Sequence, residues 1–490
     1  MTIVIGEAFQ HVERTLIGCR PNTSSVKPVH IANGLFRNIL GYTTDTGMLN
    51  RFVFVAKKKD GAIPSGHELA SIYGELLDNN RLMPEDIQES DIAELRSFLR
   101  KVVDADGGVY LHSQDMESYS AGFSGFISRD RVAQDGGELV AELLRLNNSQ
   151  LYTSIERTIE SPRDVITALS LPTLSINQRE WVPSFDASTA QFLNKPLPGV
   201  PASLLAGLLK AADCLAEHVN LHPNKLVGLR TIVLYACFVV IRHLALLESY
   251  YVPNAERRIL PFLLDFSPSE RHPVARASVM TYTLVCQSIS RFYAWALGEY
   301  LRTNRLFSIE ALRQEPIPAY TQTSASSRER NEAERREIWE LAKGESHNSE
   351  DPYSVFGQAL HDIMALEASG NPIAYLRQLG LRSGLLRPPD NFHPSKRFAV
   401  QQDMLEVLVR GAVKPGECID LPSLQARFLE RYGVIIGGRR EDEANLVGIG
   451  AYQADSNALA DNLKAFATRL SRLGFAKLLA DGVLRVELEG

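Results

Sequence analysis

The sequence predicts a predominantly helical α+β protein, and three observations support this fold class. Three long stretches, 202–218, 226–250 and 274–305, keep helical periodicity. Short strand patterns alternate with helices in residues 1–150, and a hairpin pattern closes the chain. The 490 residues are 45% hydrophobic and 22% charged, which is typical of a globular protein of several folding units and excludes wholesale disorder.

Residues 1–150 are expected to form a mixed α/β unit. Ser65 lies three residues before Glu68, the spacing of a capping box, and this predicts a helix that continues through Leu77. The other elements expected here are a strand at 51–55, a helix at 90–103, and strands at 107–112 and 122–127.

Residues 151–317 are expected to form a helical core domain from the three long helices. Its most apolar run, TIVLYACFVVI at 231–241, would rise about 16 Å as a helix, which is well short of the ~30 Å hydrocarbon core of a bilayer. A buried helix fits this run better than a membrane span. The N-terminus lacks the pattern of a signal peptide, so we expect a soluble, cytoplasmic chain without membrane contact.

Residues 318–353 change in character and predict a charged linker with an exposed helix. From Arg328 to Glu345 the chain carries five basic and six acidic residues. Opposite charges at i,i+4 spacing favour a solvated helix over a tail of one sign. A further helical segment is expected from residue 354.

Residues 396–490 carry the most informative pattern. Helices are expected at 398–409, 422–432 and 457–473, with Asp420 capping the second and Gly433 ending it. A polar, Gly-rich insertion separates the second helix from the third. Two short strands, 475–479 and 483–488, flank the turn signal Asp481-Gly482 and predict a hairpin.

This order of three helices and a hairpin resembles the winged-helix family. In that family the third helix commonly enters the major groove of DNA and the hairpin, or wing, touches the phosphate backbone or the minor groove. The resemblance implies contacts with duplex DNA from Asn457, Asn462, Lys464, Arg469 and Arg472 on the third helix, and from Lys477 and Arg485 on the wing.

The charge balance keeps a second interpretation open. Residues 396–490 contain 13 Lys+Arg and 13 Asp+Glu, whereas autonomous DNA-binding modules are usually clearly basic. The third helix keeps a local excess of basic residues. Winged helices also serve as assembly surfaces, so the same unit is equally compatible with docking onto other protein subunits.

An arginine-rich stretch in the middle domain is a second candidate site. Its members could hold an anion or phosphate, or pair with carboxylates at the edge of the helical core. The arginines expected to make such a contact are Arg257, Arg258, Arg271 and Arg276.

Motifs of known chemistry are absent from the sequence. There is no GxxxxGK[ST] phosphate loop and no GxSxG nucleophile elbow. Cys214, His218 and His222 recur on one helix face, but Pro223 follows at once and no HExxH occurs, so we expect no metal site. No cofactor is expected, and the five dispersed cysteines indicate neither a disulfide framework nor a zinc ribbon.

Three functional hypotheses follow. The first is a non-enzymatic DNA-binding or assembly subunit of a multi-protein complex, in the style of bacterial DNA-targeting or phage-defence systems. The second is a purely structural protein–protein scaffold. The third is an enzyme whose active site is dispersed along the chain and therefore shows no motif.

Overall fold

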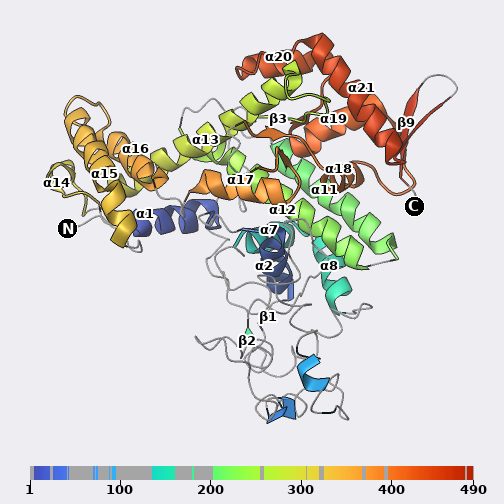
Figure 1. The fold of residues 1–490 in the computed structure, drawn as a ribbon, viewed down its shortest axis with the longest axis horizontal. Coiled ribbons are helices and arrows are strands. Elements are labelled where there is room, and N and C mark those ends of the chain that lie inside the picture. The colour runs from blue at the N-terminus through green and yellow to red at the C-terminus, as the bar shows by residue number, and fades with distance from the viewer. Residues whose placement is uncertain are drawn as a thin grey trace.

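The computed structural model (Figure 1) describes most of the chain outside residues 41–134 and 161–201. The described ranges are 5–21, 26–40, 135–160, 202–253, 259–366, 371–390 and 395–488, with short breaks at 224, 305, 319–324 and 480–482, and with a few isolated residues between 42 and 180. The strands expected at 51–55, 107–112 and 122–127 and the capping box at Ser65 lie outside the described residues. The described chain is predominantly helical with few short strands, as predicted.

The N-terminal described elements are helices that join the core of the molecule. α2 packs against α7, and both pack against α12, while α1 lies along α13. A short π-helix, η1, follows α1 directly and ends at Gly18, whose φ of 76° suits glycine. The bounds are α1 (Ile5–Val12), η1 (Glu13–Ile17), α2 (Pro28–Leu40), α7 (Asp135–Leu146) and α8 (Gln150–Glu160).

The three long helices of the middle region are confirmed as α11 (Ala202–Leu221), α12 (Lys225–Tyr251) and α13 (Pro273–Thr303). α12 is apolar on nearly all sides, and other elements cover it. By length and composition α12 could cross a bilayer, but 89% of its most apolar window is buried inside the protein, which is consistent with the core helix of a soluble protein.

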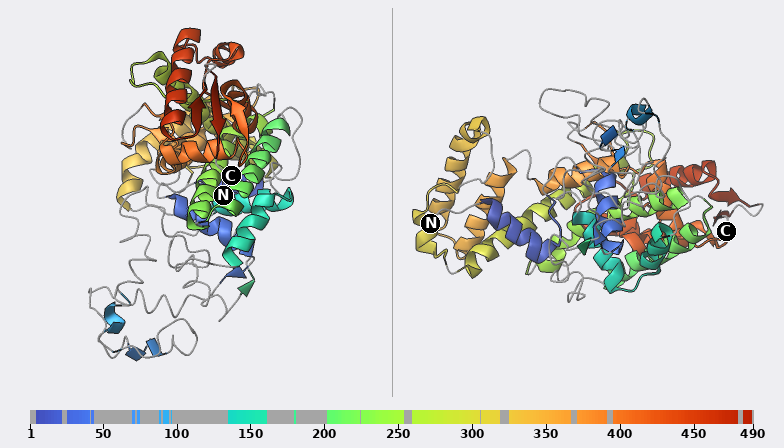
Figure 2. Two further views of the ribbon diagram at one scale, coloured as in Figure 1. Left: turned by 90° about the vertical axis from the view of Figure 1, so that its right-hand side faces the viewer. Right: turned by 90° about the horizontal axis from the view of Figure 1, so that it is seen from below.

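The charged segment forms a helix, α15 (Ala325–Glu345), and much of its described surface is exposed as expected. It is also anchored to the body. Trp339 is fully buried, donates a hydrogen bond from Nε1 to the Glu315 carbonyl at 3.2 Å, and packs in a tilted arrangement on the Phe356 ring with 5.1 Å between ring centroids. Figure 2 shows α15 and its neighbours gathered around one end of α13. These neighbours are α14 (Ile309–Gln314) and α16 (Pro352–Ala365). The next helix, α17 (Pro372–Arg382), packs against α12.

The C-terminal unit contains the expected three helices and hairpin. Asp420 caps the second helix by accepting from the Ser423 N–H at 2.9 Å, and Gly433 ends it with a φ of 63°, as the sequence predicts. The insertion is a helix, α20. The elements are α18 (Gln402–Arg410), β6 (Cys418–Asp420), α19 (Leu421–Tyr432), β7 (Val434–Ile435), α20 (Arg440–Gly448), α21 (Ser456–Arg472), β8 (Ala476–Leu478) and β9 (Leu484–Glu487).

The described strands form four small sheets. The largest has the order β6-β9-β8 and is antiparallel throughout. β3 (Phe262–Leu263) pairs in parallel with β7, which joins the middle region to the C-terminal unit. The remaining pairs are antiparallel: β1 (Tyr42–Thr43) with β2 (Arg179–Glu180), and β4 (Leu386–Arg387) with β5 (Arg397–Phe398).

One continuous hydrophobic core joins elements from both ends of the chain. The same cluster of buried side chains runs from Ile5 through α12 and α13 to Leu488. α11 packs against α19, and α12 packs against α18. At the first of these crossings, a Cβ on Gly207 would lie 2.3 Å from the Glu430 carbonyl oxygen, so the two backbones touch. The C-terminal unit therefore shares the main hydrophobic core and is not a domain with a core of its own.

Candidate interaction surface

The exposed face of α21 holds part of the predicted contact set. Asn457, Lys464 and Arg472 are exposed there, since residues three or four apart share one face of a helix. Lys464 Nζ pairs with Asp461 Oδ1 on the same face at 3.0 Å, and a solvated pair of this kind contributes little energy. The face is thus polar, with one unpaired basic side chain among those described, Arg472.

Asn462 corrects the expectation that it contacts DNA. Its side chain is fully buried. The Nδ2 group donates to the carbonyls of Leu264 at 2.8 Å and Ile436 at 2.7 Å, and Oδ1 accepts from the Phe266 N–H at 2.8 Å. Because both amide hydrogens are donated inside the fold and the side chain is fully buried, Asn462 ties α21 to the β3 and β7 segments and cannot reach a base.

Arg469 lies at the margin of this face. Its guanidinium stacks over the Phe266 ring at 5.9 Å, and burial lowers its pKa from the ordinary value. Arg387, on β4, is the nearest group of like charge that adds to this lowering. The side chain therefore packs against the body and reaches solvent only in part.

Two acidic groups, Asp455 and Glu443, lie at the N-terminal end of α21. Asp455 caps the helix by accepting from the Ala458 N–H at 2.8 Å, and the Ser456 hydroxyl donates to Glu443 of α20. In winged helices that contact DNA, base-reading residues lie near this end, and a carboxylate there repels phosphate. Within the predicted contact set, Arg469 and Arg472 lie at the C-terminal end of α21, and Lys477 and Arg485 lie on the hairpin.

One face of the β6-β9-β8 sheet carries a row of charged side chains. Lys477 pairs in register with Arg485, and Arg485 pairs with Asp420 across the next strand. Arg485 helps to hold the pKa of Asp420 below its usual value, after the larger effect of the hydrogen bonds from Ser423. The opposite face, with Ala476, Val486 and Ile419, is buried because side chains alternate along a strand.

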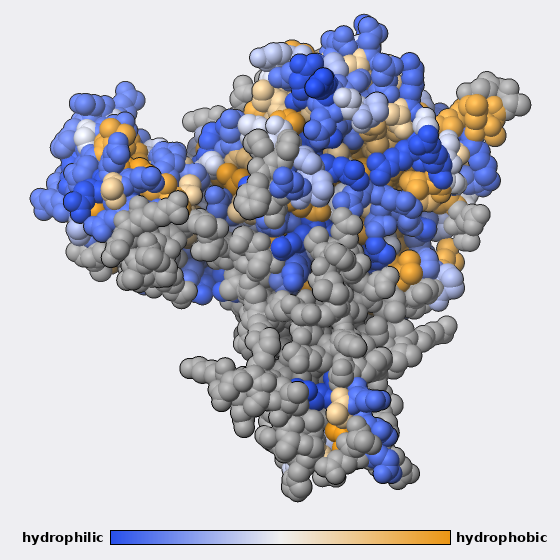
Figure 3. Space-filling model, in the orientation of Figure 1, coloured by the Kyte–Doolittle hydropathy of each residue, from blue (hydrophilic) through white to orange (hydrophobic). Residues whose placement is uncertain are grey.

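The Asp481-Gly482 turn lies outside the described residues, and the described residues on either side of it are apolar and exposed. Leu478 follows the register of the buried face but lies beyond the helices that cover it, and 72% of its surface is exposed. Leu479 is 43% and Val483 37% exposed, and a backbone hydrogen bond of 3.0 Å joins these two. Figure 3 shows hydrophobic residues gathered at this projecting end. We call the set Arg472, Lys477, Leu478, Leu479, Val483 and Arg485 the hairpin surface.

The arginine-rich stretch of the middle region is only partly described. Arg257 and Arg258 lie outside the described residues, while Arg271 and Arg276 are exposed near the start of α13. The carboxylates of this neighbourhood pair with Arg397, which the sequence reasoning missed: its Nε lies 2.8 Å from Asp265 Oδ2 and its Nη1 lies 2.8 Å from Glu270 Oε1.

The cysteine and histidine residues singled out on α11 serve packing. The Cys214 thiol donates to the Arg410 carbonyl at 3.2 Å, and His218 Nε2 lies 2.8 Å from the Val413 carbonyl oxygen. Both contacts fasten α11 to α18 and the turn after it. Among the described residues, no group of three His, Cys, Asp or Glu side chains is placed to hold a metal ion.

No protein-family model matches this chain, and no curated protein is similar to it in sequence. The hairpin surface combines exposed aliphatic side chains with basic ones at a projecting edge, and this combination is the strongest candidate for an interaction surface in the described part of the chain.

Proposed function

We propose that the protein is a non-enzymatic subunit of a multi-protein complex, and that a winged-helix-type unit at 396–490 docks it onto a protein partner. The observation that carries this proposal is the hairpin surface. An aliphatic tip of this kind is costly to leave in water and is typical of an interface. The order of helices and the β6-β9-β8 sheet support the winged-helix assignment.

The charges beside the tip define the partner. Lys477 and Arg485 lie next to one another on the exposed sheet face, and Arg472 ends the helix that leads into the hairpin. An apolar groove for Leu478 and Leu479 with acidic side chains at its rim would complement this surface. Rim charges of this kind set specificity and association rate more than affinity.

The test compares the full-length double variant Leu478→Ser/Leu479→Ser with the wild type and with Leu341→Ser. Leu341 is also strongly exposed, on α15, and is the matched control. We expect the partner that co-purifies with the tagged chain, identified by mass spectrometry, to be retained by wild type and control and lost from the double variant. Equal retention by all three proteins, with unchanged melting temperatures, would rule out docking through the tip.

Duplex DNA is a second candidate partner, and a specific observation favours it. Asn457, Arg472 and Lys477 of the predicted contact set have exposed side chains, and Arg485, beside Asp420, is partly exposed. We expect Arg472→Ala/Lys477→Ala to weaken binding of the full chain to duplex DNA. The plot of log K against log salt should become less steep, with the magnitude of its negative slope smaller by about 2. Absence of binding at ~50 mM salt would leave the assembly proposal alone.

Two broader expectations from the sequence remain predictions. They are a cytoplasmic location and a place in a bacterial DNA-targeting or phage-defence system. Identification of the proteins that co-purify with the chain tests both together, because partners from such a system would carry its nucleases or motor domains.

A further inference from the structure

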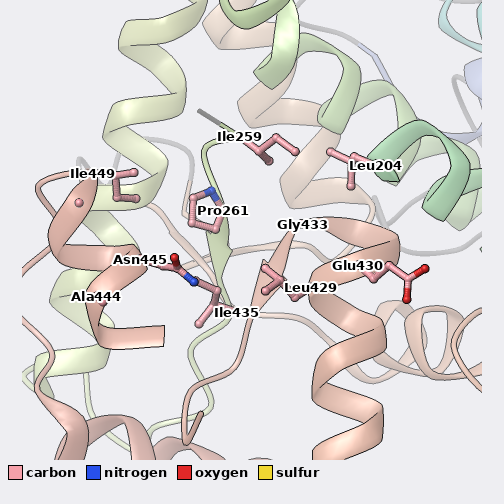
Figure 4. A pocket seen from close by; sticks show the side chains of 11 residues that line it. Leu204, Ile259, Pro261, Leu429, Glu430, Gly433, Ile435, Ala444, Asn445 and Ile449 are labelled. Carbon is pink, nitrogen blue, oxygen red and sulfur yellow. The ribbon is translucent and has the colours of Figure 1, made fainter. Parts of the chain in front are cut away.

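A cavity of about 550 Å³ lies between α11, α19, α20 and the residues that lead into β3 (Figure 4). Its walls come from segments far apart in the sequence, and its size is within the range of small-molecule sites. The residues that line it include Leu204, Ile259, Leu429, Gly433, Ala444 and Asn445.

The cavity is mostly apolar. Glu430, one of its two polar lining side chains, turns its carboxylate away from the others (Figure 4) and pairs with Lys210 at 2.7 Å. The other is Asn445, which is exposed on α20 and brings an amide to the rim. Gly433 contributes only backbone to one wall, and its φ of 63° makes glycine the natural residue there.

A buried cation lies directly behind the Gly433 wall. Arg242 of α12 is fully buried, donates from Nη1 to the Leu260 carbonyl at 2.7 Å and stacks on the Phe262 ring at 4.4 Å. A Cβ on Gly433 would lie 2.4 Å from Arg242 Nη2, so only the glycine backbone separates the guanidinium from the cavity wall.

Arg242 also lacks an anionic partner within the described part of the chain. Its Nε and Nη2 have no hydrogen-bond partner there. Burial lowers the pKa of Arg242 to about 9, so the side chain is still protonated at neutral pH. An uncompensated positive charge in a low-dielectric interior produces a positive potential in the neighbouring hollow.

We propose that this cavity binds a small amphipathic organic anion. The apolar body of the ligand would lie among Leu204, Ile259 and Leu429, with its anionic group at the Gly433 wall in the field of Arg242. The Asn445 amide would donate a hydrogen bond from the rim. Charge complementarity selects this occupant, because a neutral apolar molecule of the same shape gains nothing from the buried guanidinium.

The test uses the full chain and two fluorescent probes of nearly the same shape. One is 1-anilinonaphthalene-8-sulfonate, and the other is its uncharged analogue N-phenyl-1-naphthylamine. We expect the wild type to bind about one anionic probe per chain and to prefer it over the neutral probe. Ala444→Trp, which fills the cavity, should abolish binding of both probes, whereas Ala333→Trp on the exposed side of α15 should not.

Substitution of Arg242 separates charge from shape. Arg242→Met should weaken the anionic probe about 10-fold and leave the neutral probe unchanged. Arg242→Lys should retain most of the preference for the anion. Retention of the neutral probe shows that the variant is folded. Equal weakening of both probes by Arg242→Met, or no effect of Ala444→Trp on either, would overturn the proposal.

Discussion

Glu13 is a buried carboxyl whose pKa is raised by the core around it. It begins η1, is almost completely buried, and lies near Arg20, which Asp135 engages through both carboxylate oxygens. Burial is the largest cause that raises the pKa of Glu13 to about 8, and Arg20 opposes it only in part. Glu13 is therefore mostly protonated inside the folded protein at neutral pH.

The sign of the resulting pH dependence follows from this shift. Because the folded pKa of about 8 exceeds the ordinary glutamate value of 4.5, the folding contribution of Glu13 is fully present below pH 4.5 and is lost as the pH rises through 8. We expect Glu13→Gln to be more stable than wild type by a margin that grows between pH 5 and 8, at up to about 1.4 kcal/mol per pH unit.

Thermal unfolding at pH 5, 6, 7 and 8 measures this margin. Glu7→Gln, at an exposed position of α1, is the matched control and should leave the profile close to that of the wild type. A difference between Glu13→Gln and wild type that stays constant with pH would show that the Glu13 carboxyl does not titrate in this range.

At the scale of single residues, local backbone caps could be predicted from the sequence, whereas the buried contacts of Asn462 could not. The cap at Asp420 and the stop at Gly433 were predictable because each acts on its own backbone. Asn462 looked like an exposed polar residue, yet Leu459 and Phe466, at i−3 and i+4, place it on the apolar stripe of α21. That spacing was a usable signal. Its backbone partners at 264, 266 and 436 were not predictable, since they come from other elements.

At the scale of elements, close helix crossings depend on glycine. A Cβ on Gly357 of α16 would lie 2.4 Å from the Ala294 carbonyl oxygen and 2.5 Å from the Gly298 nitrogen of α13. Real Cβ atoms do not approach backbone this closely, so a larger residue must push the two helices apart. Gly344, on α15, has open space at the same position.

These two glycines provide a matched pair of substitutions. Gly357→Ala should lower the free energy of unfolding by about 1–3 kcal/mol, as overpacking of a core does. Gly344→Ala should raise it by about 0.5–1 kcal/mol, because alanine is the better helix former. Urea unfolding of both variants compares the two effects. A stabilising Gly357→Ala would show that α13 and α16 are not in contact at this point.

The elements that the sequence predicted best are those with strong periodicity of their own. α11, α12 and α13 were found within three residues at each end because their apolar runs are long. α20 was missed because only Asp442 and Leu446 of its nine residues are buried, which leaves no apolar stripe to detect. β6 and β7 were missed because strands of three and two residues depend on a partner strand for their existence.

For the whole molecule, the continuous core predicts that the C-terminal unit does not fold independently. α18 and α19 cover α12 and α11, and Asn462 fastens α21 to the β3 segment. We expect a chain ending at residue 395 to aggregate, and the fragment 396–490 to lack a cooperative thermal transition. Circular dichroism and size-exclusion chromatography of both pieces check this, and two soluble fragments with separate sharp transitions would contradict it.

The parallel pairing of β3 with β7 has a consequence for synthesis of the chain. Phe262 pairs with Val434, so the strand that completes this contact leaves the ribosome long after β3 has emerged. Until then, α12 and α13 expose aliphatic surface that only later residues can cover, and such nascent chains are prone to aggregate. The emerging polypeptide therefore needs shielding until β7 and the helices around it have been synthesised.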